Sequence, residues 1–147
     1  DRTVMEPGGG ICQVSSTLFN ALLLSGCRIV ERHRHYQPVT YVPLGLDATI
    51  KYGKKNLRIK NPYAFPLYIF TSINDNSLLV VVKARQKLHY RYEMHTDEET
   101  INIPFARNPD KIRQGISVYV YRKKYKGNKF IENFLLYKDY YPPVYIK

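Results

Sequence analysis

The amino-acid sequence predicts an α+β fold: one buried N-terminal helix packed on a twisted, mostly antiparallel β-sheet, with an appended C-terminal β-hairpin. Three observations predict it. Apolar residues recur at helical spacing near the N-terminus. Short segments rich in Val, Ile and Tyr, separated by Gly, Asn and Pro, follow them. The length of 147 residues suits a single domain with one hydrophobic core.

The predicted helix follows three consecutive glycines, Gly8, Gly9 and Gly10, which mark a tight backbone path or a close approach by a ligand. The apolar residues at helical spacing are Ile11, Val14, Leu18, Ala21 and Leu22. Gly26 is a helix stop signal. We therefore expect one buried helix that begins close to Cys12 and ends before Gly26.

The rest of the chain is predicted to be β-structure. The first strand candidates are residues 28–32, 39–42, 47–52, 57–60, 66–71, 77–87 and 88–94. Two further strand candidates are residues 117–125 and 129–137. Gly127 and Asn128 lie between them and signal a hairpin turn. Pro142 and Pro143 then favour an extended end. We divide the chain into a domain at residues 1–96 and a connector with a hairpin tail at 97–147, within one globular unit.

The net charge of +11 attracts polyanions, among them nucleic acid, anionic lipid and the phosphate-rich polymers of a cell wall. Charge alone does not choose among them, and a solvated basic surface is an equal alternative. No apolar run approaches the length of a membrane span, and no signal peptide is present. Because the chain begins at Asp1, we expect a fragment whose membrane anchor, if it has one, lies in a preceding segment.

Cys12 is the main candidate for chemistry. A helix N-terminus favours a thiolate, and its free N–H groups can hold a developing oxyanion during acyl transfer. The adjacent glycines would let a substrate carbonyl reach the main chain. The alternative is a small buried hydrophobe, as most free cysteines are. Cys27 has no polarising neighbour in the sequence and is interpreted as packing.

A cysteine nucleophile normally needs a base, and a third group often orients that base. His33 and His35 share a face of an extended segment, so either is a candidate base. Asp47 is the candidate orienting group, although it could equally cap its own turn. Tyr36 and Tyr41 are candidates to line a groove, and tyrosines are also ordinary strand formers.

The sequence closely resembles the VanW domain family. The resemblance is strong over about residues 8–70. It is carried by residues 8–20 (GGGICQVSSTLFN), 29–35 (IVERHRH), 38–50 (PVTYVPLGLDATI), 57–61 (LRIKN) and 66–69 (PLYI). The segment from 119–122 (YVYR) to 141–144 (YPPV) looks like the G5-like tail often found after this domain. VanW domains occur in Gram-positive cell-envelope proteins, so the resemblance implies a VanW-like catalytic domain at the extracellular face of the envelope.

Some members of this family are understood to act as L,D-transpeptidases, with the motif cysteine forming an acyl-enzyme. The resemblance implies that Cys12 attacks an L,D peptide bond of a peptidoglycan stem peptide. An acceptor amine then resolves the thioester into a cross-link, or water resolves it as a carboxypeptidase. His35 fills the histidine of the family's His-x-x-Pro-Val pattern, with His33 second, and Asp47 matches Gly-x-Asp-Ala-Thr. The expected substrate-binding residues are Gly9, Gly10, Gln13, Ser15, Ser16, Tyr36 and Tyr41.

Two departures from the family pattern affect the substrate pocket. The segment before the glycines is short, and Tyr36 stands where many members have a small residue. The alternative function is a non-catalytic module that binds peptidoglycan or teichoic acid through its basic, Tyr-rich surface. Nucleic-acid binding rests on charge and tyrosines alone and is not expected. Neither a cofactor nor a metal is expected, since no zinc-ligand spacing occurs.

Overall fold

The computed structural model describes residues 10–103 and 107–146. Within them the elements follow one another as α1 (Ile11–Leu24), β1 (Arg28–Glu31), β2 (Arg58–Lys60), β3 (Tyr68–Asn74), β4 (Ser77–Lys83), β5 (Arg91–Ile101), the short 3-10 helix η1 (Pro109–Lys111), β6 (Ile112–Arg113), β7 (Gly115–Lys126), β8 (Lys129–Tyr141) and β9 (Val144–Tyr145). The strand pairings between these elements are antiparallel. The predicted α+β class is therefore confirmed.

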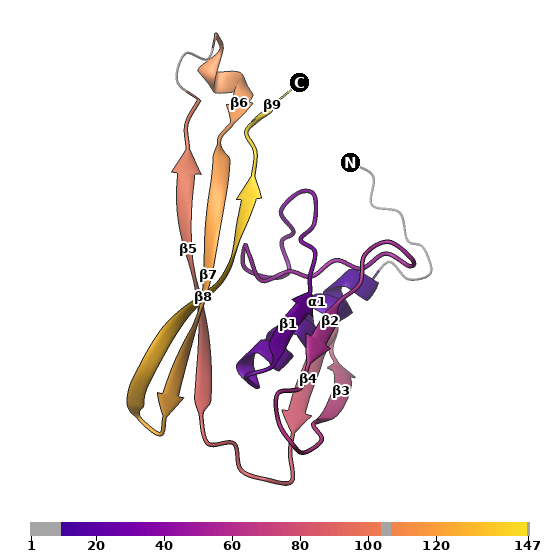
Figure 1. Ribbon diagram of the computed structural model, residues 1–147. Coiled ribbons are helices and arrows are strands. Elements are labelled where there is room, and N and C mark those ends of the chain that lie inside the picture. Colours follow the sequence, from indigo (N-terminus) through magenta and orange to yellow (C-terminus); the bar gives the residue numbers. More distant parts are fainter. Residues whose placement is uncertain (1–9, 104–106, 147) are drawn as a thin grey trace.

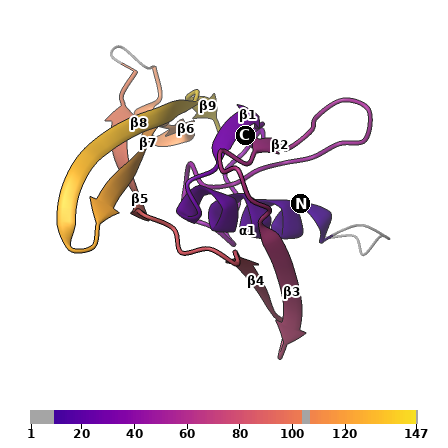
Figure 2. The same cartoon turned by 60° about the horizontal axis from the view of Figure 1, so that its bottom comes forward.

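The strands form four small sheets instead of one continuous sheet: β1–β2, β3–β4, β5–β7–β8 and β6–β9. In Figure 1 the long, twisted strands β5, β7 and β8 stand beside the unit that contains α1 and β1 to β4. Figure 2 shows that the β3–β4 hairpin projects from this unit, and β4 lies against α1 while β3 is its exposed strand. No described helix has the length and apolar character needed to span a membrane.

Both hairpins have the turn chemistry that their strands require. The β7–β8 hairpin turns at Gly127, which has φ +58°, as the sequence predicts. The β3–β4 hairpin turns at Asp75 and Asn76, which both have positive φ, as a type I′ turn requires. Strand β5 pairs with β7 from Arg91 to Ile101, so the C-terminal hairpin belongs to a three-stranded sheet. Strand β5 runs across position 96, where we divided the chain.

The predicted strands at 39–42 and 47–52 are wrong, because the structure contains no strand between β1 and β2. Segment 45–48 instead directs its backbone groups to side chains of other elements. Ala48 exchanges hydrogen bonds with the Ser16 hydroxyl, and the carbonyl of Leu46 accepts one from Asn20. These side-chain bonds satisfy backbone groups that would otherwise need a neighbouring strand.

Segment 45–48 is also the layer that joins the helix to the three-stranded sheet. Leu46 packs with Val118 and Val120 of β7, while Ala48 packs with Phe19 and Leu23 of α1. The buried face of the helix is therefore not the predicted one. Ser15, Ser16, Phe19 and Leu23 are buried, whereas Ile11 and Val14 remain 50% and 45% exposed. The buried serines are tolerated because Ala48 satisfies their hydroxyls.

Gly45 offers a test of this central layer. It has φ +89°, and a Cβ placed there would lie 2.8 Å from both Val118 Cγ1 and Val120 Cγ2. In Gly45→Ala the new methyl group would clash with these valines, and the alanine would also be strained at a positive φ. We therefore expect this variant to lower the free energy of unfolding by about 3 kcal/mol. Gly53 also has positive φ, but its Cβ would meet open space. Gly53→Ala should cost about 1 kcal/mol. Urea unfolding measures both, and equal losses would contradict the packing argument.

Candidate active site

Cys12 is the second residue of α1 and follows Ile11, which comes directly after the helix N-cap Gly10. Its partly buried Sγ atom lies 3.4 Å from Thr49 Oγ1 and 3.7 Å from the carbonyl oxygen of Ile50. Among the described residues, no side chain caps this helix end. The thiol therefore sits where the helix dipole and the first N–H groups of the helix can act on it.

The helix and segment 46–50 are held together beside Cys12. The Ser15 hydroxyl donates to the carbonyl of Ala48 at 2.5 Å, and the Ser16 hydroxyl accepts from the Ala48 N–H at 2.9 Å. These bonds place Thr49 next to the thiol, while Asp47, one residue before Ala48, turns toward His35. Ser15 and Ser16, which we expected to bind substrate, are thus buried and bonded to Ala48.

His35 and Asp47 form a hydrogen-bonded pair. His35 Nδ1 lies 2.6 Å from Asp47 Oδ2, and the same oxygen accepts the His35 backbone N–H at 2.7 Å. A carboxylate can only accept, so Nδ1 carries the proton and Nε2 is left as an acceptor. The structure thus joins two of the predicted catalytic residues. It supplies the arrangement in which a carboxylate orients a histidine base.

Beneath this pair lies a buried ion network that the sequence did not predict. Arg32 contacts Asp47 Oδ1 at 3.1 Å and Asp139 Oδ1 at 2.6 Å, and its Nε donates to the Asp47 carbonyl. The three side chains are only 6%, 3% and 7% exposed. Burial lowers the pKa of Arg32, but the hydrogen bond to Asp139 and the charges of Tyr137, Asp139 and Asp47 together outweigh it, and the pKa is raised overall. The guanidinium therefore stays charged and holds the Asp47 side chain in place.

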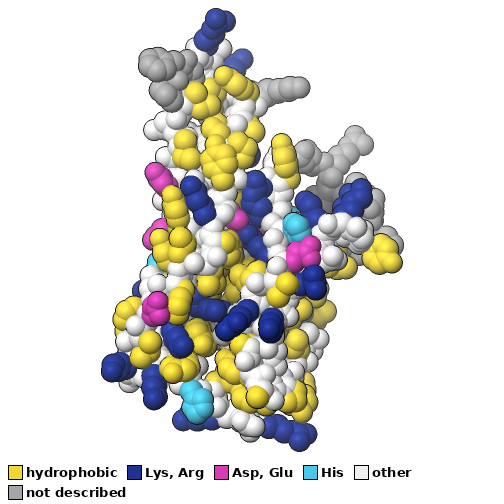
Figure 3. All heavy atoms as spheres, in the orientation of Figure 1, with side chains coloured by type: hydrophobic (Ala, Val, Ile, Leu, Met, Phe, Trp, Pro, Cys, Tyr) yellow, Lys and Arg dark blue, Asp and Glu magenta, His cyan; other side chains and the backbone are white. Residues whose placement is uncertain are grey.

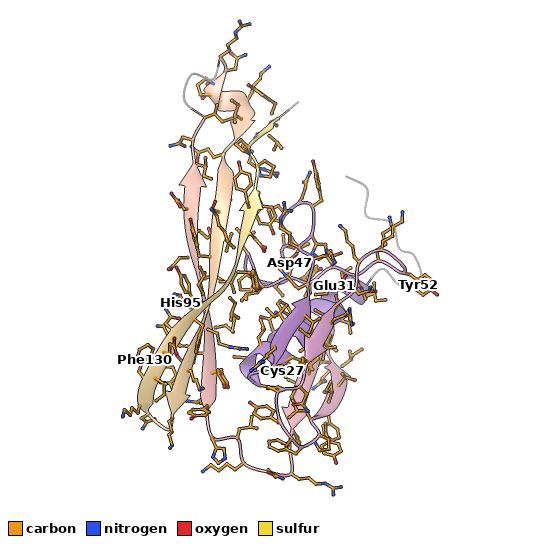
Figure 4. All side chains as sticks on the ribbon, in the orientation of Figure 1. Cys27, Glu31, Asp47, Tyr52, His95 and Phe130 are labelled. Carbon is orange, nitrogen blue, oxygen red and sulfur yellow. The ribbon has the colours of Figure 1, made fainter. Side chains whose placement is uncertain are left out.

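The C-terminal sheet supports the same network. Tyr137 of β8 donates to the carbonyl of Gly45 at 2.5 Å, and its ring lies 4.5 Å from the Arg32 guanidinium carbon. Burial raises the pKa of this phenol, so it remains a donor. Figure 4 shows Asp47 between the helical unit and the three-stranded sheet. Sequence signals for this support were weak: Arg32 stands in the alternating Arg–His run, and nothing marked Asp139.

Tyr41 lies against the side of the His35 ring that faces away from Asp47, because its hydroxyl lies 3.2 Å from His35 Nε2. Burial raises the pKa of the Tyr41 phenol more than the hydrogen-bonding effect of Ser16 lowers it, and the smaller effects of the Cys12 and Asp47 charges also raise it. The phenol therefore stays protonated and donates to Nε2. Among the described residues, no hydrogen bond joins His35 directly to Cys12; Tyr41 lies close to both.

The other predicted site residues are placed apart from this arrangement. His33 Nε2 lies 3.0 Å from Glu31 Oε1, so His33 faces Glu31 instead of Asp47. Gly10 and Gln13 are exposed at the helix start, and Tyr36 is 80% exposed. Gly9 lies outside the described residues. Cys27 is 2% exposed and burial raises its pKa, which agrees with its interpretation as a packing residue.

Two hollows border the candidate site. An apolar groove of about 510 Å³ runs between α1 and the loop before β2, lined by Ile11, Val14, Ser15, Leu18 and residues 50–52 and 55–57. It explains why the apolar residues at the helix start stay exposed. A smaller hollow of about 380 Å³ is lined by Arg32, His33, Arg34, Tyr36, Lys55 and Asp139. Within residues 10–103 and 107–146, no group of three or more His, Cys, Asp or Glu side chains could hold a metal ion.

Comparison with known proteins identifies the family. A family model described as "VanW like protein" matches residues 1–83. "Uncharacterized protein YoaR" of Bacillus subtilis strain 168 is 42% identical over 84 residues, which are 57% of this chain and 28% of that protein. "Vancomycin B-type resistance protein VanW" of Enterococcus faecalis is 28% identical over 92 residues, or 59% of this chain and 34% of that protein.

The matched part of the chain thus covers 28% of the length of the first relative and 34% of the length of the second. No solved structure matches. The family match ends at Lys83, the last residue of β4, so the G5-like identity of the tail stays a prediction. The matched segment contains Cys12, His35 and Asp47 and more than half of the described fold. The chain belongs to the VanW family.

Proposed function

We propose that this chain is the catalytic domain of a cysteine acyltransferase that cross-links peptidoglycan stem peptides at the extracellular face of the envelope, as an L,D-transpeptidase. The observation that carries the proposal is that one segment, 46–50, contacts both Cys12 and His35. Thr49 lies beside the Cys12 thiol and Asp47 bonds to His35, while Ala48 between them is bonded to α1. The name of the Enterococcus relative concerns resistance to vancomycin, which supports a cell-wall setting.

In the proposed reaction, a bound stem peptide displaces the partly exposed Tyr41 from His35. His35 Nε2 takes the thiol proton, and the Cys12 sulfur bonds to the carbonyl carbon of the L,D peptide bond. The carbon–nitrogen bond then breaks, and the leaving D-residue amine takes the proton from His35. The acceptor amine attacks the thioester, gives its proton to His35 and releases the Cys12 thiolate. N–H groups at the start of α1 would stabilise both oxyanions.

The two hollows suit a peptide donor. The apolar groove borders Cys12 through its neighbours Ile11 and Ile50, so we place the backbone of the stem there. The smaller hollow contains Lys55, which has no carboxylate within ion-pair distance among the described residues. We place a carboxylate of the stem next to this ammonium group. Charge-assisted contacts of this kind fix orientation more than affinity.

The test is intact-protein mass spectrometry after incubation with a tetrapeptide-stem muropeptide. We expect an adduct on the protein whose added mass equals that of the muropeptide minus the free terminal D-amino acid, mapped to Cys12 by peptide digestion. Cys27 is the internal control, since its burial should leave it unmodified. A folded protein that forms neither adduct nor cross-linked product would contradict the proposal. The non-catalytic wall-binding module would then take its place.

A further inference from the structure

A basic region lies at the lower end of the molecule in Figure 1, around the β7–β8 turn and the segment between β4 and β5. Residues 83–91 carry four Lys or Arg, residues 122–129 carry five, and neither segment contains Asp or Glu. They meet because Arg91 pairs with Tyr125 across β5 and β7. Together they hold nine of the chain's 23 cationic side chains. Figure 3 shows Lys and Arg atoms gathered at this end.

The two segments enclose a hollow of about 520 Å³, lined by residues 87–91 and 126–128, which we call the basic cradle. Most of the surrounding charge is not neutralised. Among the described residues, Arg91 alone of the nine forms an ion pair with a carboxylate, that of Glu93. Arg122 is turned away to the carbonyls of Leu23 and Cys27. A concave basic surface raises the local concentration of an anion more than a flat one does.

The aromatic rings beside the cradle restrict which polyanion fits. The Lys124 ammonium lies 3.9 Å from the centre of the Tyr90 ring, and the Arg91 guanidinium lies 4.5 Å from that of Tyr125. Phe130 packs edge-on against Tyr125. These ring contacts orient the cations. They also occupy ring faces on which nucleic-acid bases would have to stack. The arrangement favours an anionic chain that carries no bases.

We propose that the basic cradle binds a phosphodiester polymer of the cell wall, of the poly(glycerol phosphate) type; only its location at the wall rests on the proposed function. Lys87 and Lys126 line the hollow from two different segments of the chain, so a chain of phosphates can contact both at once. Each contact is weak alone, but neutralising several phosphates releases counterions and adds affinity that falls steeply with salt. Such binding would hold the domain at the wall without using Cys12.

The test titrates the whole chain with synthetic poly(glycerol phosphate) at several salt concentrations. The Lys87→Gln/Lys126→Gln variant should bind roughly tenfold more weakly, with a salt slope smaller by about one to two. The matched control, Lys60→Gln/Lys111→Gln, removes the same charge from exposed sites on β2 and η1 and should bind as the wild type does. Circular dichroism checks that all variants are folded.

Equal weakening in both double variants would overturn the proposal, because it would mean that net charge alone binds the polymer. Single-stranded DNA of equal phosphate number, or anionic lipid vesicles, binding as tightly as the polymer would overturn it as well. Cys12→Ala should bind the polymer as the wild type does. A wild-type chain that binds the polymer but transfers no acyl group would therefore refute the proposed function and leave the basic cradle standing. Acyl transfer by a wild-type chain that does not bind the polymer would do the opposite.

Discussion

Cys12→Ala is expected to abolish acyl transfer, lowering kcat/KM for release of the terminal D-residue by about 10⁴-fold or more. Without the sulfur no thioester forms, and the remaining groups can only orient a water molecule. The fold should survive, because the thiol is partly buried and makes only the long contacts to Thr49 and Ile50. We expect a stability loss of about 1 kcal/mol or less.

Cys27→Ala is the matched control for this prediction. Cys27 is almost completely buried near the C-terminal end of α1 and is labelled there in Figure 4. Its truncation should cost about 1–2 kcal/mol of stability and leave kcat/KM of the folded protein unchanged. D-residue release and urea unfolding, measured on both variants, separate the two effects. Turnover that persists in Cys12→Ala, or an equal loss in Cys27→Ala, would refute the assignment of the nucleophile.

Asp47→Asn is expected to lower kcat/KM by about 10³- to 10⁴-fold while leaving the side-chain shape unchanged. An asparagine can place its NH₂ group against His35 Nδ1, which then has to accept a hydrogen bond. The proton moves to Nε2, and the imidazole loses the lone pair with which it would accept the proton of Cys12. The loss should appear mainly in kcat, since Asp47 lies beneath His35 and outside both hollows.

Asp139→Asn is the control for Asp47→Asn. Both carboxylates are almost fully buried and contact Arg32, but the bonds to His35 come from Asp47. Removing either negative charge leaves Arg32 less well compensated, so both variants should lose about 3 kcal/mol of stability. The rate should fall sharply in Asp47→Asn and only several-fold in Asp139→Asn, measured at a temperature where both are folded. Equal losses of kcat/KM in the two folded variants would contradict the argument that the tautomer of His35 causes the loss of rate in Asp47→Asn.

The link from Arg32 to β8 joins the family-matched segment to the sheet beyond it. Asp139 and Tyr137 both come from β8, which lies outside the match over residues 1–83. They contact Arg32, which precedes His35 in the sequence, and Gly45, which precedes segment 46–50. The orientation of His35 by Asp47 therefore depends on residues of the C-terminal sheet as well as on the family motif.

Short-range patterns in the sequence sufficed for several features. Helical periodicity and Gly26 bounded α1 to within two residues, and Gly127 located the β7–β8 turn. Both rest on interactions between residues that are close along the chain. The pairing of His35 with Asp47 was predicted from motif positions 12 residues apart, and the structure places the two side chains in contact. His35, the first candidate base, makes this contact, whereas His33 contacts Glu31, and the role of either as a base stays a prediction.

Features that depend on distant contacts were decided by the tertiary structure alone. Segments 39–42 and 47–52 have strand-like composition, but no neighbouring strand is available, and the serines of α1 take the hydrogen bonds of Ala48 instead. Arg32 meets Asp139 across 107 residues, a contact that no local pattern encodes. The same holds for the exposed apolar start of α1, which lines a groove. Burial and charge pairing depend on which elements pack together, whereas a single sequence shows only the local structural preference of each segment.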